Sequence, residues 1–237
     1  MRSLLASLLL SSALASAALA ETFVAYTSEL PPVVNAEGAK PAGVTLEILL
    51  EMEKRSGVDL DIRFVPLARA AASVAAEPNT LWLPPVRSPD REPDYNWVAE
   101  VLASNLIFVS KDKAVNSYDA AKALSKIAVV RDGVTHKLLA SQGFENLHLV
   151  PNSTQAAKLV EGGRVDAWFA VDLESIAVIR NMGGDTAAFT MGESVRQNGH
   201  WLASNHSFDA AVAEARAKAL ENMRADGSYE AIVAKYK

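Results

Sequence analysis

The chain has 237 residues, of which 50% are hydrophobic and 22% are charged, and it contains no cysteine. This size supports one or two domains with a substantial core, and the hydrophobic fraction excludes a disordered chain. The formal net charge of -5, with no block of basic residues, argues against non-specific nucleic-acid binding, which needs a basic face. Without cysteine, the sequence excludes disulfides, cysteine-ligated zinc, iron–sulfur clusters and thiol nucleophiles.

The first residues are typical of a secretory signal peptide. Arg2 supplies a positive start, residues 4–19 are almost all Leu, Ala and Ser, and Ala18-Leu19-Ala20 fits the small-x-small cleavage pattern. A membrane anchor is the alternative, but this stretch is shorter than the roughly 20 residues that a span needs. We therefore predict cleavage after Ala20 and a soluble mature chain in the periplasm.

Strand-like runs then alternate with helical runs, which is the α/β pattern. Apolar residues at Val44, Ile48 and Met52 have helical spacing, and Gly57 supplies a stop. No linker of biased composition divides the chain, so we expect two α/β units held together by crossing strands. In the first unit the predicted strands are residues 22–27, 60–65, 80–83 and 105–110, with order resuming at 97–102, and the predicted helices are 43–56 and 67–75.

The second unit continues the alternation and ends in helices. Asn152 precedes one of its helices as an N-cap, and Ser207 precedes another. The predicted strands are residues 126–130, 147–150, 165–170, 187–190 and 200–204, and the predicted helices are 117–124, 133–141, 153–161, 173–182, 208–225 and 229–236.

Motifs for the common enzyme classes are absent from the sequence. There is no G-x-S-x-G elbow, no P-loop and no G-x-G-x-x-G fingerprint. The histidines are scattered and none has the i, i+4 spacing of a metal pair on a helix; they are His136, His148, His200 and His206. We therefore predict no metal site and no cofactor.

The segment at residues 78–97 (PNTLWLPPVRSPDREPDYNW) is the richest in informative residues. A strand leads into two prolines, which stiffen the loop that follows, and then into Arg87 and Arg91. Open α/β sheets bind ligands at the carboxyl ends of their strands, where an arginine can grip a carboxylate with two parallel hydrogen bonds. Spacing alone leaves Arg91 evenly divided between such a role and a surface ion pair with a nearby acid, and it favours the surface for Arg87.

Residues 165–172 (VDAWFAVD) form the second informative place. An apolar strand ends there and Asp172 stands at the start of a helix. Local sequence favours a helix cap for Asp172, and the functional alternative is an acceptor for a ligand ammonium group. One aspartate can serve both purposes.

Several stretches match recurring motifs of one protein family in the same order along the chain. They are residues 45–66 (TLEILLEMEKRSGVDLDIRFVP), 87–92 (RSPDRE), 127–139 (IAVVRDGVTHKLL), 161–172 (EGGRVDAWFAVD) and 223–236 (MRADGSYEAIVAKY).

On these motifs the mature chain resembles the family 3 extracellular (periplasmic) solute-binding proteins of ABC importers, of the polar-amino-acid type, and a short branch in which PNTL precedes the arginine loop. The resemblance implies a type II periplasmic-binding-protein fold, with two Rossmann-like α/β lobes joined by two crossing strands. It implies a first lobe at residues 21–106, completed by 198–237, and a second lobe at 107–197, after the signal peptide at 1–20.

The resemblance also implies roles for residues at the matching positions. Arg91 matches the arginine that grips the ligand carboxylate, and Thr135, after Gly133, matches a second carboxylate contact. Asp172 matches the aspartate that holds the ammonium group, one residue beyond the expected spacing. Glu29 and Arg69 recur in this branch and are expected to line the first lobe.

The sequence departs from the amino-acid binders around the arginine loop. Leu83, Pro84 and Val86 replace small or hydroxyl residues, and Val86 leaves only its backbone N–H for a carboxylate. Val33 and Leu67 stand where aromatics are common, so Trp82 is either a substitute platform or a buried strand residue. These departures favour a carboxylate-bearing small molecule over any one polar amino acid.

The leading hypothesis is therefore a non-enzymatic, monomeric periplasmic receptor that closes on a small carboxylate-bearing solute and docks on an ABC permease in the inner membrane. One alternative is an enzyme on the same fold, such as a dehydratase of small acids with Glu29 or Asp172 as the general acid. Another is a ligand-sensing or partner protein that works without a transporter.

Overall fold

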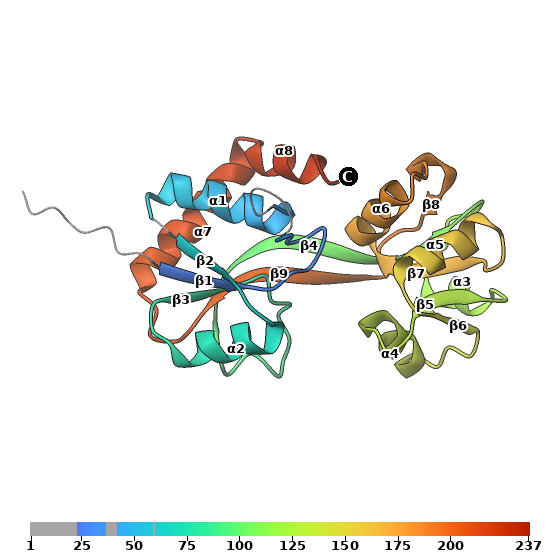
Figure 1. Ribbon diagram of the computed structural model, residues 1–237, viewed down its shortest axis with the longest axis horizontal. Helices are drawn as coiled ribbons and strands as arrows, with labels where there is room; N and C mark the ends of the chain where they lie inside the picture. Colours follow the sequence, from blue (N-terminus) through green and yellow to red (C-terminus); the bar gives the residue numbers. More distant parts are fainter. Residues whose placement is uncertain (1–22, 37–41, 59) are drawn as a thin grey trace, which may run out of the picture.

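Two α/β lobes, joined by two long strands, make up the part of the chain that the structure describes (Figure 1). The structure is a computed structural model that describes residues 23–36, 42–58 and 60–237, so the predicted signal peptide lies outside the described residues. The first lobe contains β1 (Phe23–Thr27), α1 (Val44–Ser56), β2 (Leu60–Phe64), α2 (Leu67–Ala76), β3 (Thr80–Leu83), α7 (Ala210–Ala225) and α8 (Ser228–Ala234).

The second lobe continues the alternation of strands and helices. Its elements are α3 (Tyr118–Lys122), β5 (Ile127–Val130), α4 (Val134–Ser141), β6 (Leu147–Val150), α5 (Ser153–Glu161), β7 (Ala167–Val171), α6 (Asp172–Asn181), the 3₁₀ turn η1 (Thr186–Ala188) and β8 (Thr190–Met191). The two connecting strands are β4 (Asn96–Ser110) and β9 (Arg196–Ser204).

All of these strands belong to one continuous sheet, in the order β2-β1-β3-β9-β4-β7-β5-β6, with β8 beside β4. Within each lobe the outer strands are parallel, whereas β3 is antiparallel to β9 and β7 is antiparallel to β4. Because β4 runs out of the first lobe and β9 runs back into it, these pairings turn the carboxyl ends of β1, β2 and β3 toward the second lobe. The same pairings turn the carboxyl ends of β5, β6 and β7 toward the first lobe.

The connecting strands are longer than the sequence predicts. Strands at 105–110 and 200–204, with order resuming at 97–102, were expected, whereas β4 and β9 pair from Asn96 with Ser204 to Leu106 with Arg196, with register irregularities between Trp97 and Ala99 and between Glu100 and Leu102. Polar residues interrupt the apolar pattern in the middle of β4, but partners on β9 and α6 satisfy them: Ser104 Oγ contacts His200 Nε2 at 3.0 Å, and the Asn105 amide donates to Asp172, the first residue of α6, at 2.8 Å. Because the strands are shared by both lobes, the domain bounds given above stay a prediction.

Apolar clusters cover both faces of the sheet in each lobe, as expected for parallel strands. In the first lobe α1, α7 and α8 cover one face, and α2 covers the other over Tyr26, Trp82 and Tyr95. In the second lobe α5 and α6 pack on one face, and Phe108, Phe144 and Phe169 form the core on the other. Arg180 of α6 also donates to the Lys237 carbonyl at 2.5 Å, which links the second lobe to the end of the chain.

Two local predictions near the carboxyl end of the chain are wrong, and one cap is confirmed. Asn152 caps α5 as predicted, since its side chain accepts the Gln155 N–H. The cap of α7 is Asp209 and not Ser207, because Phe208 is buried against Phe23 and the helix starts only after that anchor. The strand predicted at 187–190 is mostly the η1 turn.

A buried ion pair fastens α7 to α1 in the core of the first lobe. The Arg216 side chain is fully buried, and its Nε donates to Glu53 Oε1 at 3.1 Å. The guanidinium also lies over the rings of Phe23 and Phe208, at 5.1 and 5.8 Å from their centroids. Removing one partner of such a pair leaves the other charge buried without compensation.

We therefore expect Arg216→Ala to lower the free energy of unfolding by about 3–5 kcal/mol. The matched control is Lys218→Ala, because its exposed ion pair with Glu221 should contribute less than about 1 kcal/mol. Urea denaturation of both variants measures the difference. Replacing both partners with Met and Leu should recover most of the loss, and an Arg216→Ala loss no larger than that of the control would contradict this role.

Candidate functional site

The carboxyl ends of the parallel strands in one lobe face those in the other lobe, and a cavity lies at each of these two sets of strand ends. The cavity on the first lobe measures about 410 Å³, lies at the ends of β1 and β2, and is lined by Ser28, Glu29, Ala36, Phe64, Val65, Pro66 and Leu67. The cavity on the second lobe measures about 290 Å³ and lies where β5 and β7 end and α4, α5 and α6 begin. It is lined by Val130, Gly133, Val134, Thr135, Ser153, Trp168, Phe169, Ala170, Val171 and Glu174.

The loop that follows β3, from Pro84 to Arg91, is called the proline loop, and it is fastened to the connecting strand β9. The Trp201 N–H donates to the Pro85 carbonyl at 2.9 Å, and Val86 forms a β-bridge with His200. Pro84 is buried and its carbonyl faces His200 Nδ1 at 3.4 Å. The proline loop, which carries Arg87 and Arg91, is therefore held beside the connecting strands β4 and β9, which we call the hinge.

Arg91 is half-buried and has no ion-pair partner among the described carboxylates. Its Nη1 donates to the Val86 carbonyl at 2.9 Å, and its guanidinium lies 5.1 Å from the centre of the Trp82 ring. These contacts fix the guanidinium without neutralising its charge, so Arg91 keeps donors for an anionic ligand.

Arg87 has the opposite character. It is exposed, and its Nε and Nη2 donate to the two Glu92 carboxylate oxygens at 2.6 and 3.0 Å. Its guanidinium also lies over Trp97 and Trp201, at 5.4 and 4.7 Å from the ring centres. Arg87 is thus committed to partners on the surface of its own lobe, which is the interpretation that the sequence favours.

Trp82 is 1% exposed in β3, where its ring packs against Tyr95 at a centroid distance of 5.1 Å. With Arg91 over its ring, it supports the arginine and offers no open face for a ligand. Glu29 is exposed and lines the cavity of the first lobe, whereas Arg69 is exposed on the first turn of α2 outside that lining.

The second lobe places Thr135 on the first turn of α4, where it lines the cavity. Asp172 does not line it. One Asp172 oxygen accepts the Asn105 amide at 2.8 Å and the other accepts the Leu173 N–H at 2.8 Å. This geometry ties the start of α6 to β4, and Val171 stands at the cavity in its place.

Sequence reasoning missed two residues of the second cavity. Ser153 and Glu174 both line it, and the Ser153 hydroxyl donates to Glu174 Oε1 at 2.5 Å. Ser153 stood out in the sequence only as part of a helix start. Glu174 lies two residues after Asp172 on the same helix, and nothing in its spacing distinguishes it from a solvent-facing acid.

His200 is a further buried group at the hinge. The Pro84 carbonyl can only accept, so His200 Nδ1 carries the proton and the Ser104 hydroxyl donates to Nε2. Burial lowers the pKa of His200, while the Pro84 carbonyl and the negative charge of Asp172 oppose that shift. The neutral ring therefore joins the proline loop to both connecting strands.

Other parts of the described chain are weaker candidates for the functional site. A hollow of about 520 Å³ lies between α1 and α8, but it is on the first lobe alone and an ion pair of Lys235 with Glu47 closes one side. Within the described ranges, no group of three acidic or histidine side chains could hold a metal ion. In the same part of the chain, no helix has the length and apolar character needed to cross a membrane.

No family model matches the sequence, and no curated protein matches it either. Solved structures do match the fold. The L-cystine solute receptor of Neisseria gonorrhoeae, unliganded and open, is similar with a TM-score of 0.75 and 17% identity, over 91% of this chain and 92% of the receptor. Substrate binding domain 2 of Lactococcus lactis GlnP, also open, has a TM-score of 0.73 and 16% identity, over 91% and 94%.

A histidine kinase sensor domain with similarity to periplasmic binding proteins has a TM-score of 0.65 and 20% identity, over 91% of this chain and 95% of that domain. Because the sequence identities are 20% or lower, these structural similarities establish the fold alone. They confirm the predicted two-lobed periplasmic-binding-protein fold, and the roles of the individual site residues stay predictions.

We predict that the buried His200 makes stability depend on pH near neutrality. Its folded-state pKa lies below the ordinary 6.5, so the unfolded chain binds more protons and stability falls as pH drops below about 6.5. The slope should not exceed about 1.4 kcal/mol per pH unit. Asp226, whose pKa is lowered to about 2 by hydrogen bonds from Ser228 and Arg55, loses its contribution only in stronger acid.

Urea unfolding of the wild-type protein and of His200→Gln between pH 7.5 and 5.5 measures this effect. The variant should lose the slope in this range, whatever its absolute stability. Equal slopes in the two proteins would show that His200 does not titrate on unfolding.

Proposed function

We propose that this protein is a periplasmic solute-binding receptor that captures a small carboxylate-bearing solute, an amino acid or a related molecule, between its lobes and delivers it to an ABC importer. The observation that carries the proposal is Arg91, a half-buried guanidinium without an ion-pair partner among the described carboxylates, on the loop that follows the carboxyl end of β3 and outside the lining of both cavities. A charge-assisted contact to a carboxylate would complete its hydrogen bonding.

Contacts from the second lobe support capture by closure. Thr135 and the amino end of α4 offer donors across the gap, and Figure 1 shows the lobes apart, joined through β4 and β9. A ligand that touches both lobes binds the closed arrangement better than the open one, and this differential affinity drives closure. Around Arg91, the Val86 backbone, Pro84 and Trp82 shape the loop, while Glu29 and Arg69 edge the first lobe.

Two other functions are less well supported. A dehydratase would need a carboxyl group poised as a general acid, but Glu29 is exposed and Asp172 is bound to Asn105. A sensor role without transport is favoured by one observation, the overlap with a kinase sensor domain, which is weaker than the overlap with the open receptors. Ligand-dependent uptake by vesicles that contain an ABC permease from the same bacterium would separate transport from sensing.

The test is a thermal-shift screen of the purified protein against L-amino acids, small carboxylates and amines, followed by calorimetry on each hit. A ligand that binds only the folded state raises the melting temperature by mass action. Arg91→Ala should weaken binding of the hit more than tenfold, because a charged hydrogen-bond donor to the ligand is lost. Arg87→Ala, which removes the neighbouring surface arginine, should change the affinity less than twofold. Equal affinities in wild-type protein and Arg91→Ala would remove Arg91 from the site.

Export makes a separate prediction. Expressed with its full sequence in a bacterium with two membranes, the chain should be recovered from the periplasmic fraction with Glu21 as its first residue. Intact mass and amino-terminal sequencing measure this. Replacing Ala18 and Ala20 with Phe should block cleavage, because the site requires small residues. Recovery of the uncleaved chain from membranes in the wild type would instead support the anchor alternative.

A further inference from the structure

The second lobe carries one charged side chain in its cavity, and that charge is negative. Of the residues that line the cavity, only Glu174 is ionisable at neutral pH, and the polar remainder are Thr135 and Ser153. The other lining residues are glycine or apolar. The electrostatic character of this half of the site therefore depends on the Glu174 carboxylate.

The Glu174 carboxylate is held in place by its own lobe. Ser153, the first residue of α5, donates its hydroxyl to Oε1 at 2.5 Å, and Glu174 is itself on the first turn of α6. Helix amino ends carry partial positive charge, which a carboxylate offsets. The position that would otherwise attract an anion is thus already filled by the protein's own anion, and Oε2 has no hydrogen-bond donor among the described residues.

Asp172 cannot present a carboxylate oxygen without a hydrogen-bond donor to the cavity in the observed geometry. Both of its oxygens accept hydrogen bonds, from Asn105 on β4 and from the Leu173 N–H, and it lies outside the cavity lining. The first residue of α6 therefore serves the hinge, and the third residue faces the ligand space.

On the proposed receptor function, we infer that Glu174 is the charge-selecting residue of the second lobe. It rejects ligands whose second-lobe end is anionic and favours a positively charged nitrogen there. The two lobes then present opposite charges, with the Arg91 guanidinium for the anionic end of the solute and the Glu174 carboxylate for its cationic end. Dicarboxylates are excluded because like charges face each other without a counterion.

Matched probes test this inference on the purified protein. The probes are L-amino acids with their 2-hydroxy counterparts, and straight-chain monocarboxylates that end in an ammonium, a hydroxyl or a second carboxylate. The wild type should bind one ammonium-bearing probe at least tenfold tighter than its hydroxyl counterpart and should not bind the dicarboxylates. Glu174→Gln should weaken the ammonium-bearing probe about tenfold and leave the hydroxyl counterpart within twofold.

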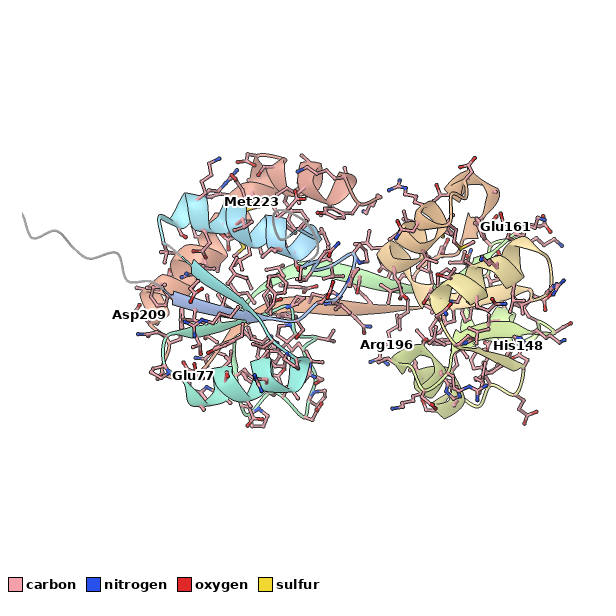
Figure 2. All side chains as sticks on the ribbon, in the orientation of Figure 1. Glu77, His148, Glu161, Arg196, Asp209 and Met223 are labelled. Atoms are coloured by element: carbon pink, nitrogen blue, oxygen red, sulfur yellow. The ribbon has the colours of Figure 1, made fainter. Side chains whose placement is uncertain are left out.

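Glu161→Gln is the matched control, with the same change of charge on the same lobe. Glu161 ends α5, the helix that Ser153 begins, so it lies at the opposite end of that helix from the cavity, and Figure 2 shows it at the outer side of the lobe. Its affinities should equal those of the wild type. The Glu174→Gln side chain still accepts the Ser153 hydroxyl, so the fold should persist, and an unchanged melting temperature without ligand verifies this.

The outcomes separate the two proposals. Wild-type binding with the affinity of Glu174→Gln unchanged, or wild-type preference for a dicarboxylate, overturns the role of Glu174 and leaves the receptor function standing. A wild-type protein that binds none of the probes and none of the compounds in the wider screen overturns the receptor function itself.

Discussion

The antiparallel pairing of β4 with β9 is the constraint on which the rest of the structure depends. The two strands run in opposite directions through both lobes, and β3 and β7 join them antiparallel. The direction of every parallel strand in either lobe follows from these pairings. As a result the carboxyl ends of both sets of strands, and the amino ends of the helices that follow them, face each other across the hinge. The location of the candidate site is thus a consequence of backbone hydrogen bonding, and side chains decide only what binds there.

Each lobe carries one charged group of the candidate site, and contacts within that lobe hold the group in position. Arg91 is held by the Val86 carbonyl and the Trp82 ring, and Glu174 is held by Ser153, so each is positioned by its own lobe before any ligand arrives. Pre-positioned groups bind more tightly because less side-chain freedom is lost on binding. Opposite charges on separate lobes attract only weakly through water and salt, so in the proposed receptor a bridging ligand would contribute much more to closure than the two charges alone.

The sequence predicted the elements that depend on local patterns. Helical and strand periodicity placed the alternating units, the Asn152 cap was correct, and the spacing favoured a surface role for Arg87. The prediction from sequence failed where contacts between residues far apart in the chain determine the local structure. The predicted strand began only at Asn105 and left residues 103–104 out, but Ser104 and Asn105 have partners that lie 96 and 67 residues away in sequence. Glu174 was missed because its contact with Ser153 joins two helices 21 residues apart, and Ser207 was mistaken for a cap because the burial of Phe208 delays the start of α7.

In the proposed receptor, the geometry of the two connecting strands would also determine which contacts change when the lobes close. The proline loop is fastened to β9 at Trp201, and the start of α6 is fastened to β4 at Asn105, so both segments are tied close to the same pair of strands. Register irregularities in β4 between Trp97 and Ala99 and between Glu100 and Leu102 interrupt the ladder on the first-lobe side, and irregularities of this kind bend a strand locally. Leu67, at 54% exposed, lines the cavity of the first lobe, and Val134, at 77% exposed, lines that of the second. In the proposed receptor, a closure that brought these two cavities together would remove both apolar side chains from water, and that removal would favour the closed form once a ligand had satisfied the charged groups.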